Sequence, residues 1–164
     1  MSEAEHLADA LVRLLSNSEG GWFTPVSVAL EGLSAEQAAR VPAQGFNSVW
    51  MVVNHMTYWQ DYLVHRLRGE REYSWKPSSK GSWQSIKQPY LEHEWGADRE
   101  SLFATNKVLA AVVGALSDEE LNQPYDEGRS ERHKVIQGII AHNSYHTNEI
   151  ISIRHMLGLW LKKT

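Results

Sequence analysis

Two histidines near the end of the chain have the spacing of metal ligands. His142 and His146 are four residues apart, so on an α-helix their side chains differ by about 40° in direction and lie one turn apart. Imidazole nitrogens on neighbouring turns can both come within about 2.1 Å of a single cation. A pair of hydrogen-bonded histidines without metal would have the same spacing, so the pair alone leaves both interpretations open.

The surroundings of this pair favour a metal. Ile139 and Ile150 flank it at helical spacing, which places both rings in an apolar stripe where unpartnered imidazoles would cost a few kcal/mol to bury. His55, which lies 87 residues before His142, falls in the apolar stripe of another long predicted helix. A bundle can bring it opposite the pair. Three protein ligands leave a position for water or substrate, as in catalytic metal sites.

The other histidines serve as internal controls. His133 and His155 are each nine residues from a candidate ligand on the same predicted helix, which turns them to the opposite side. We expect His6, His65 and His93 to be solvated or partly buried, as histidines on other helices usually are.

Other catalytic patterns fit less well. Zinc peptidases of the His-Glu-x-x-His type need a glutamate directly after the first histidine, where this chain has Asn143. Di-iron sites in bundles need Glu-x-x-His on two helices, and Glu3 with His6 is the only such pair. Ser144 lacks the glycines that surround the nucleophile of serine hydrolases.

Composition excludes several further classes of protein. The length of 164 residues predicts a single domain over residues 1–164. Cysteine is absent, which excludes disulfides, iron–sulfur clusters and thiol nucleophiles. The net charge of −4 and the dispersed basic residues disfavour nucleic acid as a partner. No apolar run approaches the ~18 residues of a membrane span, and the acidic N-terminus does not resemble a signal peptide, so we expect a cytoplasmic protein.

Helical periodicity predicts an all-α chain. Three capping-box patterns, in which Ser2, Ser34 and Ser117 each precede Glu or Gln by three residues, indicate helix starts. We expect Asn47 to cap a further helix and Gly20 and Gly21 to interrupt the first one. The main helices are predicted over residues 2–15 with a continuation at 25–31, 48–68, 89–116 and 131–157. These lengths favour an antiparallel four-helix bundle with short extra helices.

Residues 69–88 are predicted to form a loop that is longer than most irregular connections. A lid over the metal pocket is the favoured interpretation. The alternative is a platform for single-stranded nucleic acid, which Glu70 and Glu72 and the negative net charge disfavour. The basic and aromatic residues behind this alternative are Arg66, Arg68, Arg71, Lys76, Lys80, Tyr73, Trp75 and Trp83.

Two motifs around the candidate ligands match a known family. One is Asn54-His55 in an aromatic-rich helix, and the other is the run at residues 141–146, Ala-His-Asn-Ser-Tyr-His, followed by Ile150, Arg154 and Leu157-Gly158. Weaker support comes from residues 32–39 before Pro42 and from residues 47–50. From about residue 21 to 158 the chain resembles the DinB-like family, also called the YfiT-like or damage-inducible family.

This resemblance implies a four-helix bundle, often a homodimer, that binds a divalent ion such as nickel, zinc or iron. The residues that match the family's three metal ligands are His55, His142 and His146. Some members transfer low-molecular-weight thiols such as bacillithiol or mycothiol, and others are described as metal-dependent hydrolases. The resemblance therefore implies a small-molecule substrate and, for a transferase, a thiol cosubstrate.

The chain departs from the family pattern directly after His146. Where the family usually has a small residue, Gly and Gln, this chain has Thr147, Asn148 and Glu149. Glu149 lies three residues beyond His146, so the two side chains can share a face. Its carboxylate could be a fourth ligand, an acceptor that orients a ligand or a proton acceptor, and the alternative is an exposed helix carboxylate.

Further candidates flank the proposed ligands. Glu149 and Tyr58 are the candidate catalytic residues, and Asn54, Asn143 and Asp98 are candidates for orienting a ligand or substrate, with packing or solvation as the alternative. Two functions stay open at this point. One is a metal-dependent enzyme, a thiol S-transferase or a hydrolase. The other is a non-enzymatic metal-binding or interaction module, which a shell completed by a fourth protein ligand would favour.

Overall fold

Helices account for the regular structure of this protein. The computed structural model describes residues 1–16, 22–70, 79–125 and 130–161. These described residues contain eight helices and no strand, with one isolated β-bridge between Pro124 and Glu131. The four long helices are α1 (Glu3–Ser16), α4 (Val49–Leu67), α6 (Glu92–Gly114) and α8 (Arg132–Met156). The short ones are α2 (Val26–Ala29), α3 (Ala35–Ala39), α5 (Ser79–Ser82) and α7 (Asp118–Leu121). The all-α prediction is confirmed.

Side-chain caps fix several helix starts. The predicted capping boxes form at Ser34 before α3 and at Ser117 before α7. At α4 the cap differs from the prediction, because the hydroxyl of Ser48 accepts the hydrogen bond from the Met51 amide at 3.2 Å. Asn47 is left free for another contact, described below. Gly20 and Gly21, which were predicted to interrupt the first helix, lie outside the described residues.

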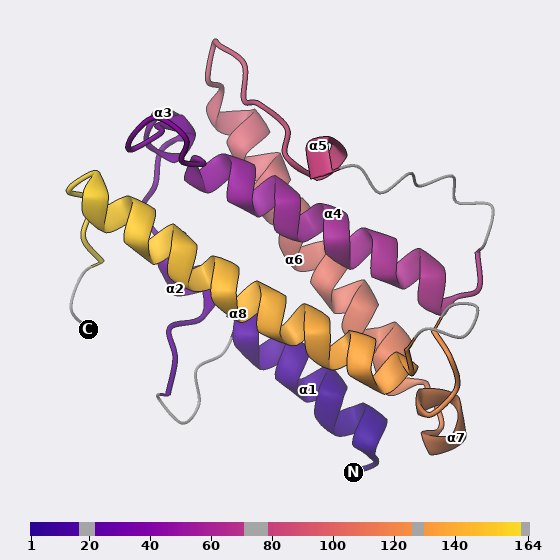
Figure 1. Cartoon of the computed structure of the whole chain (residues 1–164). Helices are drawn as coiled ribbons and strands as arrows, with labels where there is room; N and C mark the ends of the chain where they lie inside the picture. Colours follow the sequence, from indigo (N-terminus) through magenta and orange to yellow (C-terminus); the bar gives the residue numbers. More distant parts are fainter. Residues whose placement is uncertain (17–21, 71–78, 126–129, 162–164) are drawn as a thin grey trace.

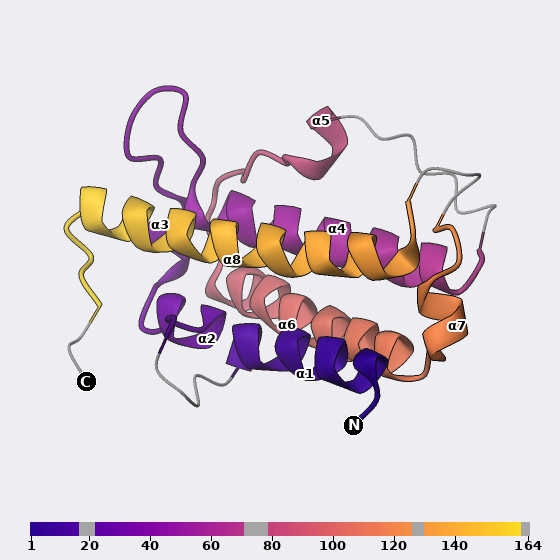
Figure 2. The same cartoon turned by 60° about the horizontal axis from the view of Figure 1, so that its bottom comes forward.

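The four long helices pack in a ring. Each of α1 and α4 packs against both α6 and α8 (Figures 1 and 2). Two groups of buried apolar side chains fill the interior, one around Trp95 and Leu102 and the other around Leu11 and Leu109. Among the described residues, no helix is both long enough and apolar enough to span a membrane.

Neighbouring helices do not all run in opposite directions. Near the start of both helices Trp50 on α4 contacts Trp95 on α6, with ring centroids 5.4 Å apart. Further along both, Asn106 donates a 2.8 Å hydrogen bond to Gln60. Helices α4 and α6 are therefore parallel, whereas the α4–α8 and α1–α6 pairs have the predicted antiparallel direction. The long connection from α4 to α6 is the physical reason, because it allows the chain to return along the bundle before α6 begins.

A buried arginine ties the end of α8 to the rest of the fold. Arg154 donates through Nη1 to the carbonyl oxygens of Ala29, the last residue of α2, at 2.6 Å and of Glu31 at 2.9 Å. Its Nε donates to the carbonyl of Leu159 at 3.0 Å. Charge-assisted bonds of this kind are stronger than neutral ones, so they hold α8 in place relative to α2.

Candidate metal centre

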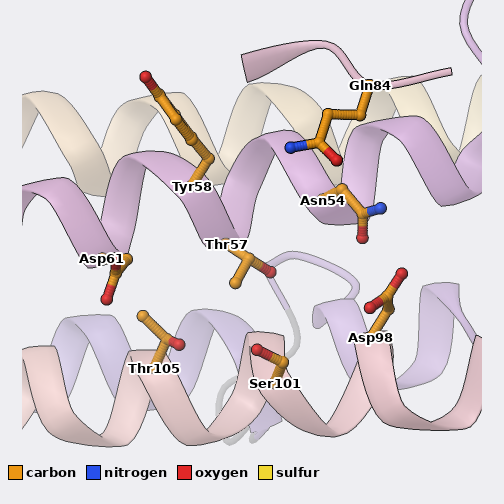
Figure 3. Close-up of a pocket in the computed structure, with 8 residues that line it drawn as sticks. All are labelled: Asn54, Thr57, Tyr58, Asp61, Gln84, Asp98, Ser101 and Thr105. Carbon is orange, nitrogen blue, oxygen red and sulfur yellow. The ribbon is translucent and has the colours of Figure 1, made fainter. Parts of the chain in front are cut away.

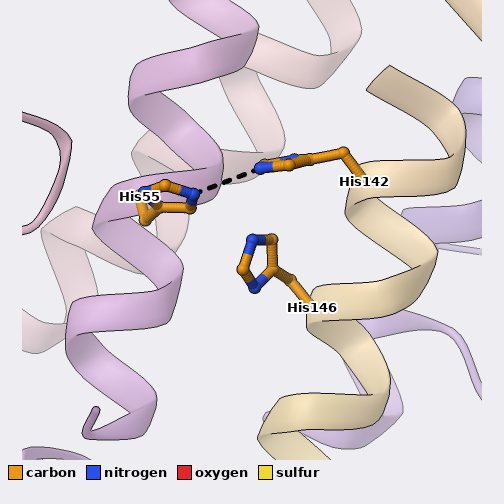
Figure 4. A group of neighbouring side chains, drawn as sticks. All are labelled: His55, His142 and His146. Atoms are coloured by element: carbon orange, nitrogen blue, oxygen red, sulfur yellow. Dashed lines mark hydrogen bonds between the residues drawn. The ribbon is translucent and has the colours of Figure 1, made fainter. Parts of the chain in front are cut away.

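Three histidines from two helices face one point. His55 projects from α4, and His142 and His146 project from α8 (Figure 4). Their candidate ligand atoms all lie within 4.8 Å of one another, and the Nε2 atoms of His55 and His142 are 3.1 Å apart. Two nitrogens bound to one tetrahedral ion at about 2.1 Å would be about 3.4 Å apart. Small side-chain rotations would therefore suffice to place a metal ion among the three rings.

The helix periodicity explains this convergence. On α8 the buried positions include Ile139, His146 and Ile150, which lie on the face that packs against the bundle. On α4, Val52 and Met56 are fully buried on either side of His55. The antiparallel packing of α4 and α8 then sets the histidine levels opposite each other, as the sequence-based interpretation required.

Burial keeps two of the rings neutral. Burial, followed by charge repulsion from His146 and His142, lowers the pKa of His55 to about 4. The backbone of Ser82 acts in the opposite direction and raises this pKa. Burial likewise lowers the pKa of His142 to about 4, with repulsion from His146 as the next cause. At neutral pH each of these two rings retains a nitrogen lone pair, which is the form that binds metal.

Glu149 holds the third ring from outside the cluster. Its Oε2 lies 2.6 Å from Nδ1 of His146, and its Oε1 accepts a 3.1 Å hydrogen bond from Nδ2 of Asn47. Burial raises the pKa of Glu149, but the hydrogen bonds from His146 and Asn47 outweigh it and lower the pKa overall. When Nδ1 of His146 donates to this carboxylate, Nε2 keeps its lone pair. Glu149 therefore has the place of an acceptor that orients a ligand.

Asn143 lies beside His142 and is fully buried. Its Oδ1 is 3.3 Å from Nδ1 of His142, so it can accept a hydrogen bond from that nitrogen and leave the lone pair on Nε2. Its Nδ2 has no hydrogen-bond partner among the described residues. The contact brings Asn143 next to His142, and its role in orienting that ring stays a prediction.

The predicted loop contributes an aromatic cover. Trp83, which follows α5, stacks on the ring of His55 with centroids 3.7 Å apart and an interplanar angle of 11°. It also meets His146 edge to face at 5.7 Å. Among the other residues of the nucleic-acid alternative, Arg71, Tyr73, Trp75 and Lys76 lie outside the described residues. Trp83 falls in the loop predicted as a lid, but no pattern in the sequence indicated its contact with His55.

Three candidate residues lie elsewhere, in a polar pocket of about 420 Å³ between α4 and α6. Its lining residues are Asn54, Thr57, Tyr58, Asp61, Gln84, Asp98, Ser101 and Thr105 (Figure 3). None of the three clustered histidines lines this pocket, and the predicted roles of Asn54, Tyr58 and Asp98 stay predictions. Successive helical residues point about 100° apart, so the residue before His55 faces α6 instead of α8. The Oδ2 atom of Asp98 accepts a 2.6 Å hydrogen bond from Nε1 of Trp50.

The control histidines point away from the cluster. His133 lies 3.7 Å from a carboxylate oxygen of Glu3, and His155 packs on the ring of Trp160 at 4.4 Å. His6 and His93 are exposed, and His65 contacts acidic side chains near the end of α4.

Comparison with known proteins agrees with the geometry. The sequence model described as the DinB superfamily matches residues 26–150 of the chain. The matched stretch includes all three clustered histidines and Glu149. Searches of curated proteins and of solved structures found no match.

Proposed function

The chain belongs to the DinB superfamily, and from this premise we propose that it is a metal-dependent enzyme with a three-histidine centre. The observation that carries the proposal is the convergence of His55, His142 and His146, whose candidate ligand atoms lie within 4.8 Å of one another. Side chains that are distant in the sequence and meet with their nitrogens turned inward need a common partner, and a divalent ion is the partner that this donor set suits.

The donor set narrows the choice of ion. Neutral imidazoles suit zinc, nickel and iron, and the chain has no thiolates that would favour softer ions. When bound, such an ion would lower the pKa of a coordinated water or thiol and so provide a nucleophile near neutral pH. Three protein donors leave room for that group.

The chain's own residues prepare the centre in two ways. Glu149 accepts from Nδ1 of His146 and is itself held by Asn47, which keeps the Nε2 lone pair of that ring directed inward. Trp83 covers one face of His55 and limits the access of water on that side. Preorganised ligands and a partly dry site are what metal-dependent catalysis requires.

The reaction we propose is thiol S-transfer or hydrolysis of a small-molecule substrate, with a low-molecular-weight thiol as cosubstrate in the first case. The non-enzymatic module is less well supported, because Glu149 is engaged by His146 and Asn47 instead of completing the ligand set. Glu149 is therefore proposed as a positioning residue. Tyr58 has no support as a catalytic residue from its place between α4 and α6. The homodimer stays a prediction.

Elemental analysis of the protein purified without a tag tests the metal. We expect about one divalent ion per chain in the wild type and a large loss in His55→Ala and His142→Ala. His6→Ala is the matched control, because His6 is exposed and far along the chain from the cluster. Equal metal content in all four proteins would contradict the proposal.

Turnover assays on the metal-loaded protein then separate the reaction types. One panel pairs low-molecular-weight thiols with model electrophiles, and a second offers ester and amide substrates. Turnover in the first panel alone identifies a transferase, and turnover in the second alone identifies a hydrolase. Full metal content with no turnover in either panel would favour the non-enzymatic module.

A further inference from the structure

An apolar pocket lies beside the candidate metal centre, between α4 and α8. Its volume is about 470 Å³, which is in the range of small-molecule sites. His142 belongs both to this pocket and to the histidine cluster. The lining residues are Trp59, Tyr62, Leu63, Tyr125, Val135, Gly138, Ile139 and His142.

Trp59 links the pocket to the cluster. Its ring meets His55 edge to face at 6.2 Å and His142 at 6.4 Å, measured between ring centroids. A molecule in the pocket would therefore contact the indole ring and, past it, the imidazole of His142. The pocket and the centre therefore adjoin each other and share the side chain of His142.

Two tyrosines of the lining, Tyr62 and Tyr125, lie beside Arg66. The guanidinium carbon of Arg66 lies 5.9 Å from the ring centroids of both Tyr62 and Tyr125. Burial, followed by a hydrogen bond with Tyr62, raises the pKa of the Tyr125 hydroxyl, so it stays neutral at any physiological pH. Apart from His142, the lining thus offers hydrocarbon and ring surfaces, two tyrosine hydroxyls and the indole of Trp59.

Gly138 keeps this space open. It lies within α8, where glycine is unfavourable compared with alanine because it adds backbone freedom to the unfolded chain. A Cβ atom placed on it would meet no atom within 4 Å. The helix therefore has an unfavourable residue at the pocket wall although a side chain would fit there. The volume that this glycine leaves empty is available to a ligand.

We propose that this pocket binds the apolar part of the substrate, an aromatic ring or a branched aliphatic group, while the polar reacting group lies at the three histidines. This inference rests on the proposed metal centre and names the substrate class for it. A hydrophobic pocket with a few polar groups at one end favours a ligand with the same division. The wall of Trp59, Leu63 and Ile139 selects the apolar part, and His142 marks the reacting end.

A pair of thiols that share a donor and differ in apolar size tests the inference. The protein is loaded with Co²⁺, and the binding of ethanethiol and of 2-phenylethanethiol is followed by the sulfur-to-cobalt charge-transfer absorption. We expect the phenyl compound to bind at least about tenfold more tightly, because its ring becomes buried in the pocket. The quantity compared between proteins is the ratio of the two dissociation constants.

The side chain added in Gly138→Leu occupies part of the pocket, and in this variant the ratio should fall to about threefold or less. Gly96→Leu is the matched control, because Gly96 lies in α6, outside the pocket, and a Cβ there also meets no atom within 4 Å. It should keep the wild-type ratio. Should Gly138→Leu lose cobalt, Gly138→Ala takes its place, and an intermediate ratio is expected because one methyl group fills part of the space.

The outcomes separate the two proposals. If the wild-type protein binds cobalt but binds the two thiols with equal affinity, the pocket inference is overturned while the metal centre is not. The same conclusion follows if neither Gly138 substitution changes the ratio of the two dissociation constants. A wild-type protein that binds no cobalt overturns the metal centre, and the pocket inference with it. A ratio that falls equally in Gly96→Leu would show a general effect of helix substitution and would also overturn the pocket.

Discussion

The carboxylate of Glu149 lies 2.6 Å from Nδ1 of His146, one turn along the same helix. This contact decides which nitrogen of His146 faces the other two rings, because a nitrogen that donates to a carboxylate has no lone pair left for a metal.

Substitution of Glu149 should weaken metal binding. We expect Glu149→Ala to raise the dissociation constant for Zn²⁺ by about 10- to 100-fold, because His146 loses the partner that fixes its orientation. Glu149→Gln should lose less, since the amide oxygen can still accept from Nδ1. Competition with a chromophoric chelator measures both values. Glu100→Gln on the exposed side of α6 is the control, and wild-type affinity in both Glu149 variants would show that the contact does not position the ring.

Asn47 and Ser48 are neighbours with separable effects. Ser48→Ala should lower the free energy of unfolding by about 1 kcal/mol, because its hydroxyl caps α4, and should have little effect on metal affinity. Asn47→Ala should weaken metal binding and have little effect on the free energy of unfolding, because the amide of Asn47 donates to Glu149. Urea denaturation of the metal-free proteins and zinc titration provide the two measurements. A larger loss of stability in Asn47→Ala would restore Asn47 as the helix cap.

The metal-free protein should lose stability as the pH falls below about 6.5. The pKa of His55 and that of His142 are lowered from 6.5 to about 4 in the folded state. Well above pH 6.5 both rings are neutral whether the chain is folded or not, so they contribute nothing to the pH dependence there. Between 6.5 and 4 the unfolded chain binds protons that the folded chain does not, and the free energy of unfolding decreases.

The double variant His55→Gln/His142→Gln isolates this contribution. As the pH falls, the unfolding free energy of this variant should decrease less steeply than that of the wild type. The difference should reach about 1–2 kcal/mol by about pH 5, a value reduced because solvent screens the half-buried ring of His142. Carboxylates titrate alike in both proteins and cancel. If the unfolding free energies of the two proteins changed in parallel from pH 7 to 5, the two rings would not have the lowered pKa values that their burial predicts.

Removal of the aromatic cover should speed metal release. In Trp83→Ala the stacked face of His55 becomes accessible, and loss of a ring contact of this kind corresponds to a ~2- to 10-fold change in rate. The release of bound Zn²⁺ to excess chelator in a stopped-flow experiment measures it. Trp160→Ala is the control, because Trp160 is 67% exposed and packs on His155, away from the cluster. Equal release rates in the three proteins would exclude a covering role.

The histidine cluster could be predicted from the sequence because each histidine lies where apolar residues recur at helical spacing. Each ring lies on the buried stripe of its own helix, and two buried stripes in a bundle have to meet. Helix caps were also predictable where a capping box was present, as at Ser34 and Ser117. The all-α class follows from the same local signals.

The other features of the site depend on how the helices pack against one another, which the pattern of a single helix does not report. Asn54 is adjacent to His55 in the sequence, yet the rotation of α4 relative to its neighbours turns it toward α6. The parallel direction of α4 and α6 is not encoded in the pattern of either helix. Trp83 belongs to an irregular segment with no period to interpret, and its stacking on His55 arises only from the path of the chain.

That path has a consequence for how the centre can evolve. A chain that forms two parallel helices in succession has to return along the first before the second begins, and here the returning segment places Trp83 against the ring of His55. Helix α8 places His142 at the same level of the bundle as His55. Changes in the length or composition of the returning segment can therefore alter access to the histidines while the framework that carries them stays the same.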